Sequence, residues 1–85
     1  MVEYQINLKR SSEKELERLP DKIHDRIVHR LLLLKKNPRP QSAKKLRGSE
    51  SYRIRVSDYR ILYIIDDDNK KVEIYSIAHR REAYR

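Results

Sequence analysis

The sequence YRIRVSDYRILY, residues 52–63, is the stretch from which we interpret the fold of this chain. Aromatic or aliphatic side chains alternate with arginines up to Ser57-Asp58, two residues that are common in tight turns. Because successive side chains of a strand point to opposite faces, the pattern predicts a β-hairpin with strands at about 52–56 and 59–65.

Three arginines of this hairpin, Arg53, Arg55 and Arg60, fall on one face of the predicted strands. A two-residue turn places Arg55 opposite Arg60, and directly opposed like charges destabilise a strand pair by up to several tenths of a kcal/mol, on the order of other cross-strand terms. One interpretation is a solvated face that Asp58 or Glu50 screens. The other, which we favour, is an anion site on an open sheet face, because arginine offers forked donors to phosphate oxygens and stays charged.

The first third of the chain predicts a strand followed by two helices. Apolar residues alternate with polar ones at the start: Val2, Tyr4, Ile6 and Leu8. Ser12 followed by Glu15 forms a capping-box pattern for a first helix, which Pro20 ends. Asp21 is placed to cap a second helix, whose apolar stripe has helical spacing: Ile23, Ile27, Leu31 and Leu34.

The remaining segments complete a single α+β domain over residues 1–85. Residues 38–51 are expected to form a loop, and a last strand is expected at about 71–78 after a turn at 66–69. The order β-α-α-β-β-β predicts a mainly antiparallel four-stranded sheet with a helix hairpin on one face. A short C-terminal tail or helical turn would cross the other face, which is otherwise open.

The composition indicates a basic protein with a polyanionic or acidic partner. There are 21 Lys and Arg residues against 13 Asp and Glu, a formal net charge of +8. Divided at residue 42, each half of the chain carries +4, so a basic patch has to be made by folding. The absence of cysteine excludes disulfides, thiol catalysis and cysteine zinc sites. No signal-peptide core or bilayer-length apolar run is present, so we expect a cytoplasmic protein without membrane contact.

The last residues, IAHRREAYR at 77–85, add further cations to this picture. His79, Arg80 and Tyr84 follow a strand that is expected to neighbour the hairpin, so the tail can reach the arginines. Phosphate-binding cations beside a stacking aromatic ring are what a contact with single-stranded RNA needs.

The stretch KLRGSESYRIRVSDYRILY at 45–63, together with AHRREAY at 78–84, resembles the RelE/ParE superfamily of bacterial and archaeal toxins, and most closely its RelE branch. This resemblance covers essentially the whole chain. It implies ribosome-dependent cleavage of messenger RNA in the A site, by attack of a ribose 2′-OH on the adjacent phosphate, with no metal or cofactor. The residues that the resemblance assigns to catalysis are Arg53, Arg55, Arg60, Arg80 and Tyr84.

The chain departs from the family pattern at the hairpin, where relatives often carry lysine. Lysine can lose its proton when cations surround it, whereas arginine cannot, so Arg55 cannot act as a general base. His79 is the candidate for that role, because the unperturbed pKa of histidine lies near neutrality. Further RNA contacts are expected from basic residues of the loop and the tail: Lys44, Lys45, Arg47 and Arg81.

The resemblance also implies partners: a cognate antitoxin with an acidic amphipathic segment, and the ribosome with its mRNA and rRNA. Two alternatives remain open. A ParE-like chain would inhibit DNA gyrase, but that branch generally lacks the terminal basic and tyrosine group to which Arg80 and Tyr84 belong. A basic RNA-binding module without catalysis would bind RNA and leave it intact.

Overall fold

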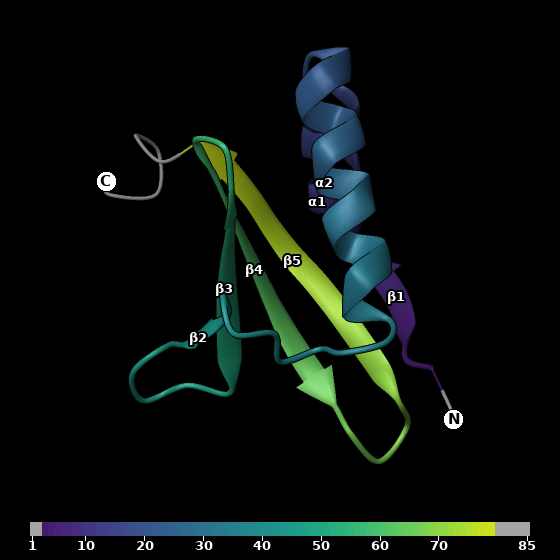
Figure 1. The fold of residues 1–85 in the computed structure, drawn as a ribbon, viewed down its shortest axis with the longest axis vertical. Helices are drawn as coiled ribbons and strands as arrows, with labels where there is room; N and C mark the ends of the chain where they lie inside the picture. The colour runs from purple at the N-terminus through teal and green to yellow at the C-terminus, as the bar shows by residue number, and fades with distance from the viewer. Residues whose placement is uncertain (1–2, 80–85) are drawn as a thin grey trace.

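The computed structural model describes residues 3–79, which form two helices packed on one face of a five-stranded sheet (Figure 1). The elements in chain order are β1 (Gln5–Leu8), α1 (Arg10–Glu17), α2 (Asp21–Leu34), β2 (Lys44–Lys45), β3 (Ser51–Val56), β4 (Tyr59–Asp66) and β5 (Lys71–His79). The predicted α+β class and the three long strands are confirmed. The predicted four-stranded sheet is wrong by one strand, because β2 lies in the segment expected to be a loop and pairs with β3.

The strand order across the sheet is β1-β5-β4-β3-β2. β1 runs parallel to β5, and the other neighbours are antiparallel. The chain therefore leaves β1 at one edge, crosses one face as α1 and α2, and returns at the opposite edge. α1 packs on β1 and β5, while α2 packs on β1 and β3. Within residues 3–79 the opposite face carries no helix, so it is available to a ligand.

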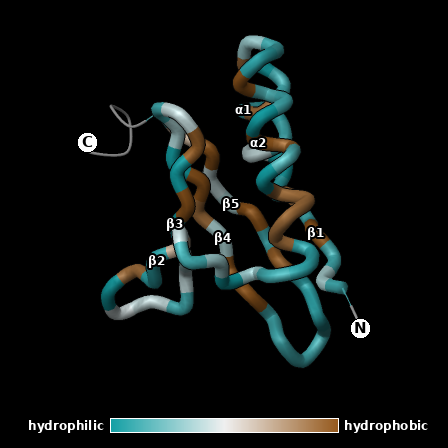
Figure 2. Tube along the Cα trace, viewed as in Figure 1, coloured by the Kyte–Doolittle hydropathy of each residue, from teal (hydrophilic) through white to brown (hydrophobic). Residues whose placement is uncertain are grey.

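The core lies between the helices and the three long strands. In Figure 2 the apolar residues follow α2 and the central strands. The most buried apolar side chains are Ile27, Leu31, Leu34, Ile54, Val56, Ile61, Tyr63, Val72, Ile74 and Ile77. The stripe predicted for the second helix is thus confirmed at its last three positions, and Ile23 is partly buried at its start. Burial on this scale, at about 25 cal/mol per Å² of apolar surface, is what holds the helices to the sheet.

The start of α1 differs from the capping-box prediction. The helix begins at Arg10, with Lys9 in the cap position and no side-chain cap hydrogen bond. Ser12 is fully buried inside the helix, and the Glu15 Oε1 accepts a hydrogen bond from the backbone N–H of Ile77 at 3.3 Å. Packing against β5 therefore recruits the two residues that the local pattern assigned to a cap.

The start of α2 is shifted by one residue from the prediction. Pro20 occupies the cap position and Asp21 is the first helical residue, so Asp21 makes no side-chain cap hydrogen bond. The Pro20 carbonyl accepts from the backbone N–H of His24 at 2.9 Å, which begins the helical ladder. Asp21 still lies in the first turn, where a negative charge interacts favourably with the helix dipole.

A hydrogen-bonded cluster, which we call the Arg39 clasp, ties the loop after α2 to the far end of the sheet. The Arg39 guanidinium donates to both carboxylate oxygens of Asp67, at 3.1 and 2.8 Å, and to the Tyr52 hydroxyl at 3.0 Å. The Tyr4 hydroxyl donates to the Asp67 Oδ1 at 2.6 Å. The hydrogen bonds from Arg39 and then Tyr4 lower the pKa of Asp67 to about 2.

The clasp predicts a specific loss of stability in acid. The Asp67 pKa is lowered on folding, so its contribution is complete above the ordinary carboxyl pKa of about 3.9 and disappears as the pH falls towards about 2. Asp67→Asn should lower the free energy of unfolding at neutral pH. In this variant the free energy of unfolding should also fall less steeply between about pH 3.9 and about pH 2. Urea unfolding followed by circular dichroism at a series of pH values measures this. If the free energy of unfolding fell equally steeply with pH in the variant and the parent, ionised Asp67 would not stabilise the fold through the clasp.

Candidate nucleic-acid interface

The β3–β4 hairpin has the register that the sequence predicted. Arg55 pairs with Arg60, and the strands join through the two residues Ser57-Asp58. Ser57 has a φ of 55°, a left-handed backbone conformation that is uncommon for residues other than glycine. The turn therefore holds the two arginines directly opposite each other.

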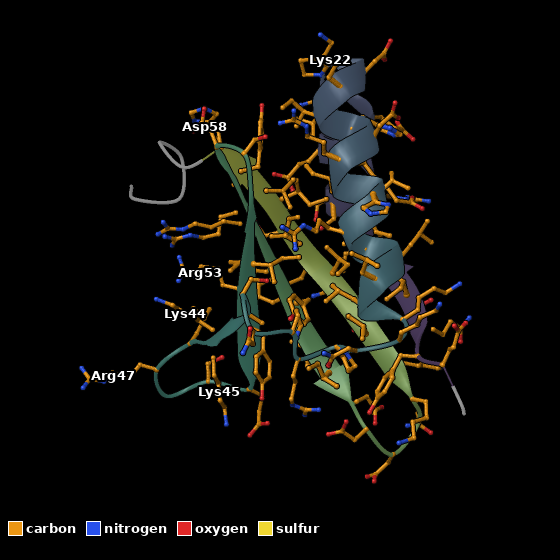
Figure 3. All side chains as sticks on the ribbon, viewed as in Figure 1. Lys22, Lys44, Lys45, Arg47, Arg53 and Asp58 are labelled. Carbon is orange, nitrogen blue, oxygen red and sulfur yellow. The ribbon has the colours of Figure 1, made fainter. Side chains whose placement is uncertain are left out.

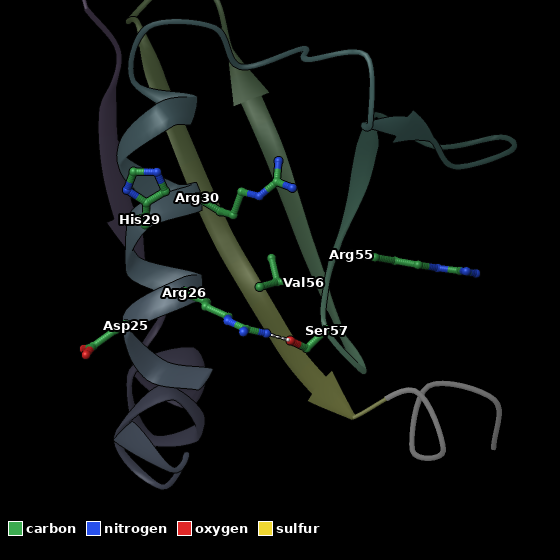
Figure 4. A pocket seen from close by; sticks show the side chains of 7 residues that line it. All are labelled: Asp25, Arg26, His29, Arg30, Arg55, Val56 and Ser57. Atoms are coloured by element: carbon green, nitrogen blue, oxygen red, sulfur yellow. Dashed lines mark hydrogen bonds between the residues drawn. The ribbon is translucent and has the colours of Figure 1, made fainter. Parts of the chain in front are cut away.

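The side chains of Arg53, Arg55 and Arg60 form what we call the arginine face, on the side of the sheet away from the helices. Their neighbours Ile54, Val56 and Ile61 are buried in the core, so strand alternation turns the arginines the other way. Arg53 and Arg60 are half-buried and Arg55 is exposed. Figure 3 shows Arg53 directed away from the helices, and Figure 4 shows the same for Arg55. The predicted grouping of these three cations on one face is supported by their positions.

Small and apolar residues of the neighbouring strands complete this surface. Arg60 pairs with Ala78 on β5, while Arg53 pairs with Leu62, which pairs in turn with Ser76. Ala78 and Ser76 have short side chains, so they leave space beside the Arg60 side chain for a phosphate to approach. Sequence reasoning did not identify these neighbours.

A bulge in β5 explains why Ser76 was missed. Leu62 pairs with Ser76 but the next residue, Tyr63, pairs with Ile74, so β5 has one extra residue there. A signal existed in the sequence, since the spacing of buried residues changes from two at Val72 and Ile74 to three at Ile77.

The basic residues predicted to contact RNA from the loop are distributed over different surfaces. Lys44 pairs with Arg53 and therefore extends the arginine face across β2. Lys45 pairs with Tyr52, so its side chain belongs to the opposite face of the sheet. Arg47 is exposed in the loop between β2 and β3, and its side chain extends away from the sheet in Figure 3.

His79 lies on the helix side of the sheet, not on the arginine face. It pairs with Tyr59, and the two rings meet edge to face with their centroids 5.3 Å apart. Tyr59 in turn pairs with the buried Val56, which identifies the face. Sequence position alone suggested proximity to the arginines, but strand alternation separates His79 from them by the thickness of the sheet.

The other predicted tail residues, Arg80, Arg81 and Tyr84, lie outside the described residues. Residues 3–79 contain no cluster of three or more His, Asp or Glu side chains that could hold a metal ion. None of the helices in this part of the chain is long and apolar enough to cross a membrane.

Comparison with known proteins places these features in a family context. Residues 6–84 match the family described as the ParE toxin of type II toxin-antitoxin system, parDE. Toxin RelE of Mycobacterium tuberculosis is 33% identical over 84 residues, which cover 96% of this chain and 87% of that protein.

Two solved structures are similar over nearly the full chain. The toxin-antitoxin complex RelBE2 from Mycobacterium tuberculosis contains a chain with a TM-score of 0.82 and 29% identity, covering 93% of this chain and 100% of that one. The archaeal RelE-RelB complex from Pyrococcus horikoshii OT3 has a TM-score of 0.83 and 26% identity, with 91% and 94% covered.

Proposed function

Because the chain belongs to the RelE/ParE superfamily and is a RelE-type toxin of a type II toxin–antitoxin system, we propose that it is a metal-independent endoribonuclease that cleaves mRNA in the ribosomal A site. The observation that carries the proposal is the arginine face. Three guanidinium groups gather on a sheet surface that no described helix covers, although the Arg55–Arg60 pairing opposes two like charges. Binding of phosphate oxygens across them would offset that repulsion.

The proposed reaction is an internal displacement at phosphorus. The ribose 2′-oxygen forms a bond to the adjacent phosphorus, the bond to the 5′-oxygen of the next nucleotide breaks, and a cyclic phosphate results. One proton leaves the 2′-OH and one is delivered to the departing 5′-oxygen. Negative charge grows on the phosphate in the transition state, and the arginine face would stabilise that charge with preorganised donors.

The proton transfers need a group other than these arginines, which stay protonated. The resemblance assigns Tyr84 to the site, while the position of His79 against Tyr59 favours a packing role for the imidazole over the predicted acid–base role. Our proposal therefore gives charge stabilisation to Arg53, Arg55, Arg60 and Arg80, and leaves His79 outside the reacting group.

We expect His79→Ala to leave the pH dependence of cleavage unchanged. The measurement is single-turnover cleavage on programmed ribosomes between about pH 5.5 and about pH 8.5, the range in which histidine titrates. His79→Phe is the matched control, since it keeps a ring against Tyr59 and cannot exchange a proton. Loss of the acidic limb in both variants would contradict the packing role and restore the acid–base role.

A cognate antitoxin is the proposed protein partner. Both structural relatives are toxins solved in complex with antitoxins. Beside β1 and α2 lies a groove of about 290 Å³, whose apolar lining residues include Ile6, Leu8, Val28, Leu31 and Leu32. Leu32 is 54% exposed, so an acidic amphipathic segment would find an apolar strip on a basic protein there. Failure of Leu32→Glu to weaken neutralisation by the antitoxin would refute this docking site.

The test of the proposed function is to map mRNA ends after synthesis of the protein in a translating extract, beside a gyrase supercoiling assay. New ends at ribosome-occupied codons, lost when initiation is blocked, are the expected result. The matching family is described as the ParE toxin, so the gyrase inhibition that the sequence resemblance implies for a ParE-like chain is the second candidate. Inhibited supercoiling without new ends would favour that candidate, and RNA binding without either effect would favour a non-catalytic module.

A further inference from the structure

We propose that a cleft between α2 and the β3–β4 turn binds a backbone phosphate of RNA, as an anchoring site separate from the arginine face. The cleft has a volume of about 430 Å³ and is shown in Figure 4. Its lining includes Arg26 and Arg30 of α2, Arg55 and Val56 of β3, and Ser57 of the turn. The inference rests on the proposed function for the identity of the ligand as RNA.

Arg26 and Arg30 are placed to act together. They are four residues apart, so they lie one helical turn from each other on the side of α2 that faces the sheet (Figure 4). Like charges at this spacing destabilise a helix, and no carboxylate among residues 3–79 lies within ion-pair distance of either guanidinium. An anion in the cleft would remove that repulsion.

The one acidic residue that lines the cleft does not neutralise it. The Asp25 Oδ1 lies 3.3 Å from the His24 Nδ1, and Figure 4 shows the Asp25 side chain directed away from Arg26 and Arg30. His29 stands on the outer side of α2 in the same view, whereas the Arg26 and Arg30 side chains are directed from α2 toward the strands.

Ser57 supplies a neutral partner on the opposite wall. The Arg26 Nη1 donates to the Ser57 Oγ at 3.1 Å, which fixes one edge of the guanidinium across the cleft. The serine hydroxyl proton and the remaining guanidinium N–H groups can donate to phosphate oxygens. Ser57 adopts a left-handed φ of 55°, where glycine or asparagine is more favourable, and the hydrogen bond that its hydroxyl accepts from Arg26 gives a reason for serine there.

The cleft and the arginine face are on different sides of β3. Arg55 borders the cleft, but in Figure 4 its side chain leaves the strand in the direction opposite to α2. The nucleotides that bind the arginine face therefore cannot also occupy the cleft. The phosphate in the cleft belongs to another segment of RNA. Arg26 and Arg30 would then increase affinity without touching the reacting phosphate, so they should affect KM and leave kcat unchanged.

The experiment compares Arg26→Gln/Arg30→Gln with the control Arg10→Gln/Arg18→Gln, which removes the same charge from exposed residues of and next to α1. Both pairs are placed in an Arg60→Ala background to prevent cleavage. We expect the first pair to weaken binding of programmed ribosomes or of a short single-stranded RNA about tenfold. Loss of this phosphate contact should also reduce the magnitude of the slope of log K against log salt by about 0.7 to 0.9. The control pair should change both quantities much less.

Three results would overturn the proposal. Equal effects of the two pairs would mean that RNA affinity depends on the net positive charge of the protein and not on a site in the cleft. Unchanged RNA affinity with saturable shifts of the Ser57 amide signal by inorganic phosphate would mean an adventitious ion only. Unchanged RNA affinity with weakened antitoxin binding would identify an acidic protein segment as the occupant.

The same variants separate this inference from the proposed function. With Arg60 restored, a tenfold higher KM at unchanged kcat supports the cleft, whereas unchanged KM and kcat reject the cleft and leave the nuclease intact. If the parent protein cleaves no RNA, the proposed function fails, and the binding comparison still decides whether the cleft holds a phosphate.

Discussion

Replacing Arg60 by alanine will lower the rate of mRNA cleavage by about two to three orders of magnitude, the usual effect of removing one preorganised donor to a developing negative charge. Arg60 is half-buried and lies between Arg55 on β3 and the small Ala78 on β5, at the centre of the arginine face.

Folding should survive this change. The variant relieves the opposition of Arg55 and Arg60, worth a few tenths of a kcal/mol, and loses a comparable amount of packing by the arginine stem. We therefore expect the free energy of unfolding to change by less than about 0.5 kcal/mol. Arg60→Lys should be intermediate in rate, because it keeps the charge without the forked donors. Arg18→Ala, an exposed arginine after α1, is the control. A folded Arg60→Ala protein with the parent's cleavage rate would exclude the arginine face as the catalytic site.

Replacing Tyr63 by alanine will cost about 3 to 5 kcal/mol of unfolding free energy, as for other large buried aromatic residues. Tyr63 is fully buried, and its ring stacks on Tyr52 with centroids 5.9 Å apart. Its hydroxyl donates to the Pro38 carbonyl at 2.8 Å, and burial raises its pKa to about 12, so it remains a donor. A domain of this length has roughly 4 to 13 kcal/mol in total, so Tyr63→Ala should remove a large fraction of its stability.

Two companion variants separate the contributions. Tyr63→Phe keeps the ring but leaves the Pro38 carbonyl without its donor, which costs about 1 to 2 kcal/mol. Ile64→Ala removes the adjacent side chain, which is 38% exposed, and should change stability by no more than about 0.5 kcal/mol. Urea unfolding of the three variants provides the measurement. Equal losses in Tyr63→Phe and Tyr63→Ala would mean that the hydrogen bond, not packing, holds the loop after α2 to the sheet.

The elements that the sequence predicted correctly depend on short-range patterns. The period-two alternation on either side of Ser57-Asp58 determined the hairpin, its register and the common face of its arginines. The spacing of Ile27, Leu31 and Leu34 determined which side of α2 is buried. These patterns persist in the folded protein because each one is a periodic property of a strand or helix that buries one face.

Features that join distant parts of the chain were decided by the tertiary structure. β2 is two exposed residues long and has no alternation to detect, so it exists only because Lys44 meets Arg53. The capping-box pattern of Ser12 and Glu15 was overruled when α1 packed on β5 and Glu15 bonded to Ile77. The Arg39–Asp67 pair joins residues 28 positions apart, and nothing local identifies either as the partner of the other.

The site shows the same division between local and tertiary determinants. The arginines share a face because alternation along one hairpin is local, whereas the face that His79 occupies depends on how β5 pairs with β4. The cleft between Arg26, Arg30 and Ser57 needs α2 to pack beside the β3–β4 turn. A sequence specifies which side chains alternate and which are charged. Only the packing of the helices on the sheet, driven by burial of the shared core, determines which of those charges meet.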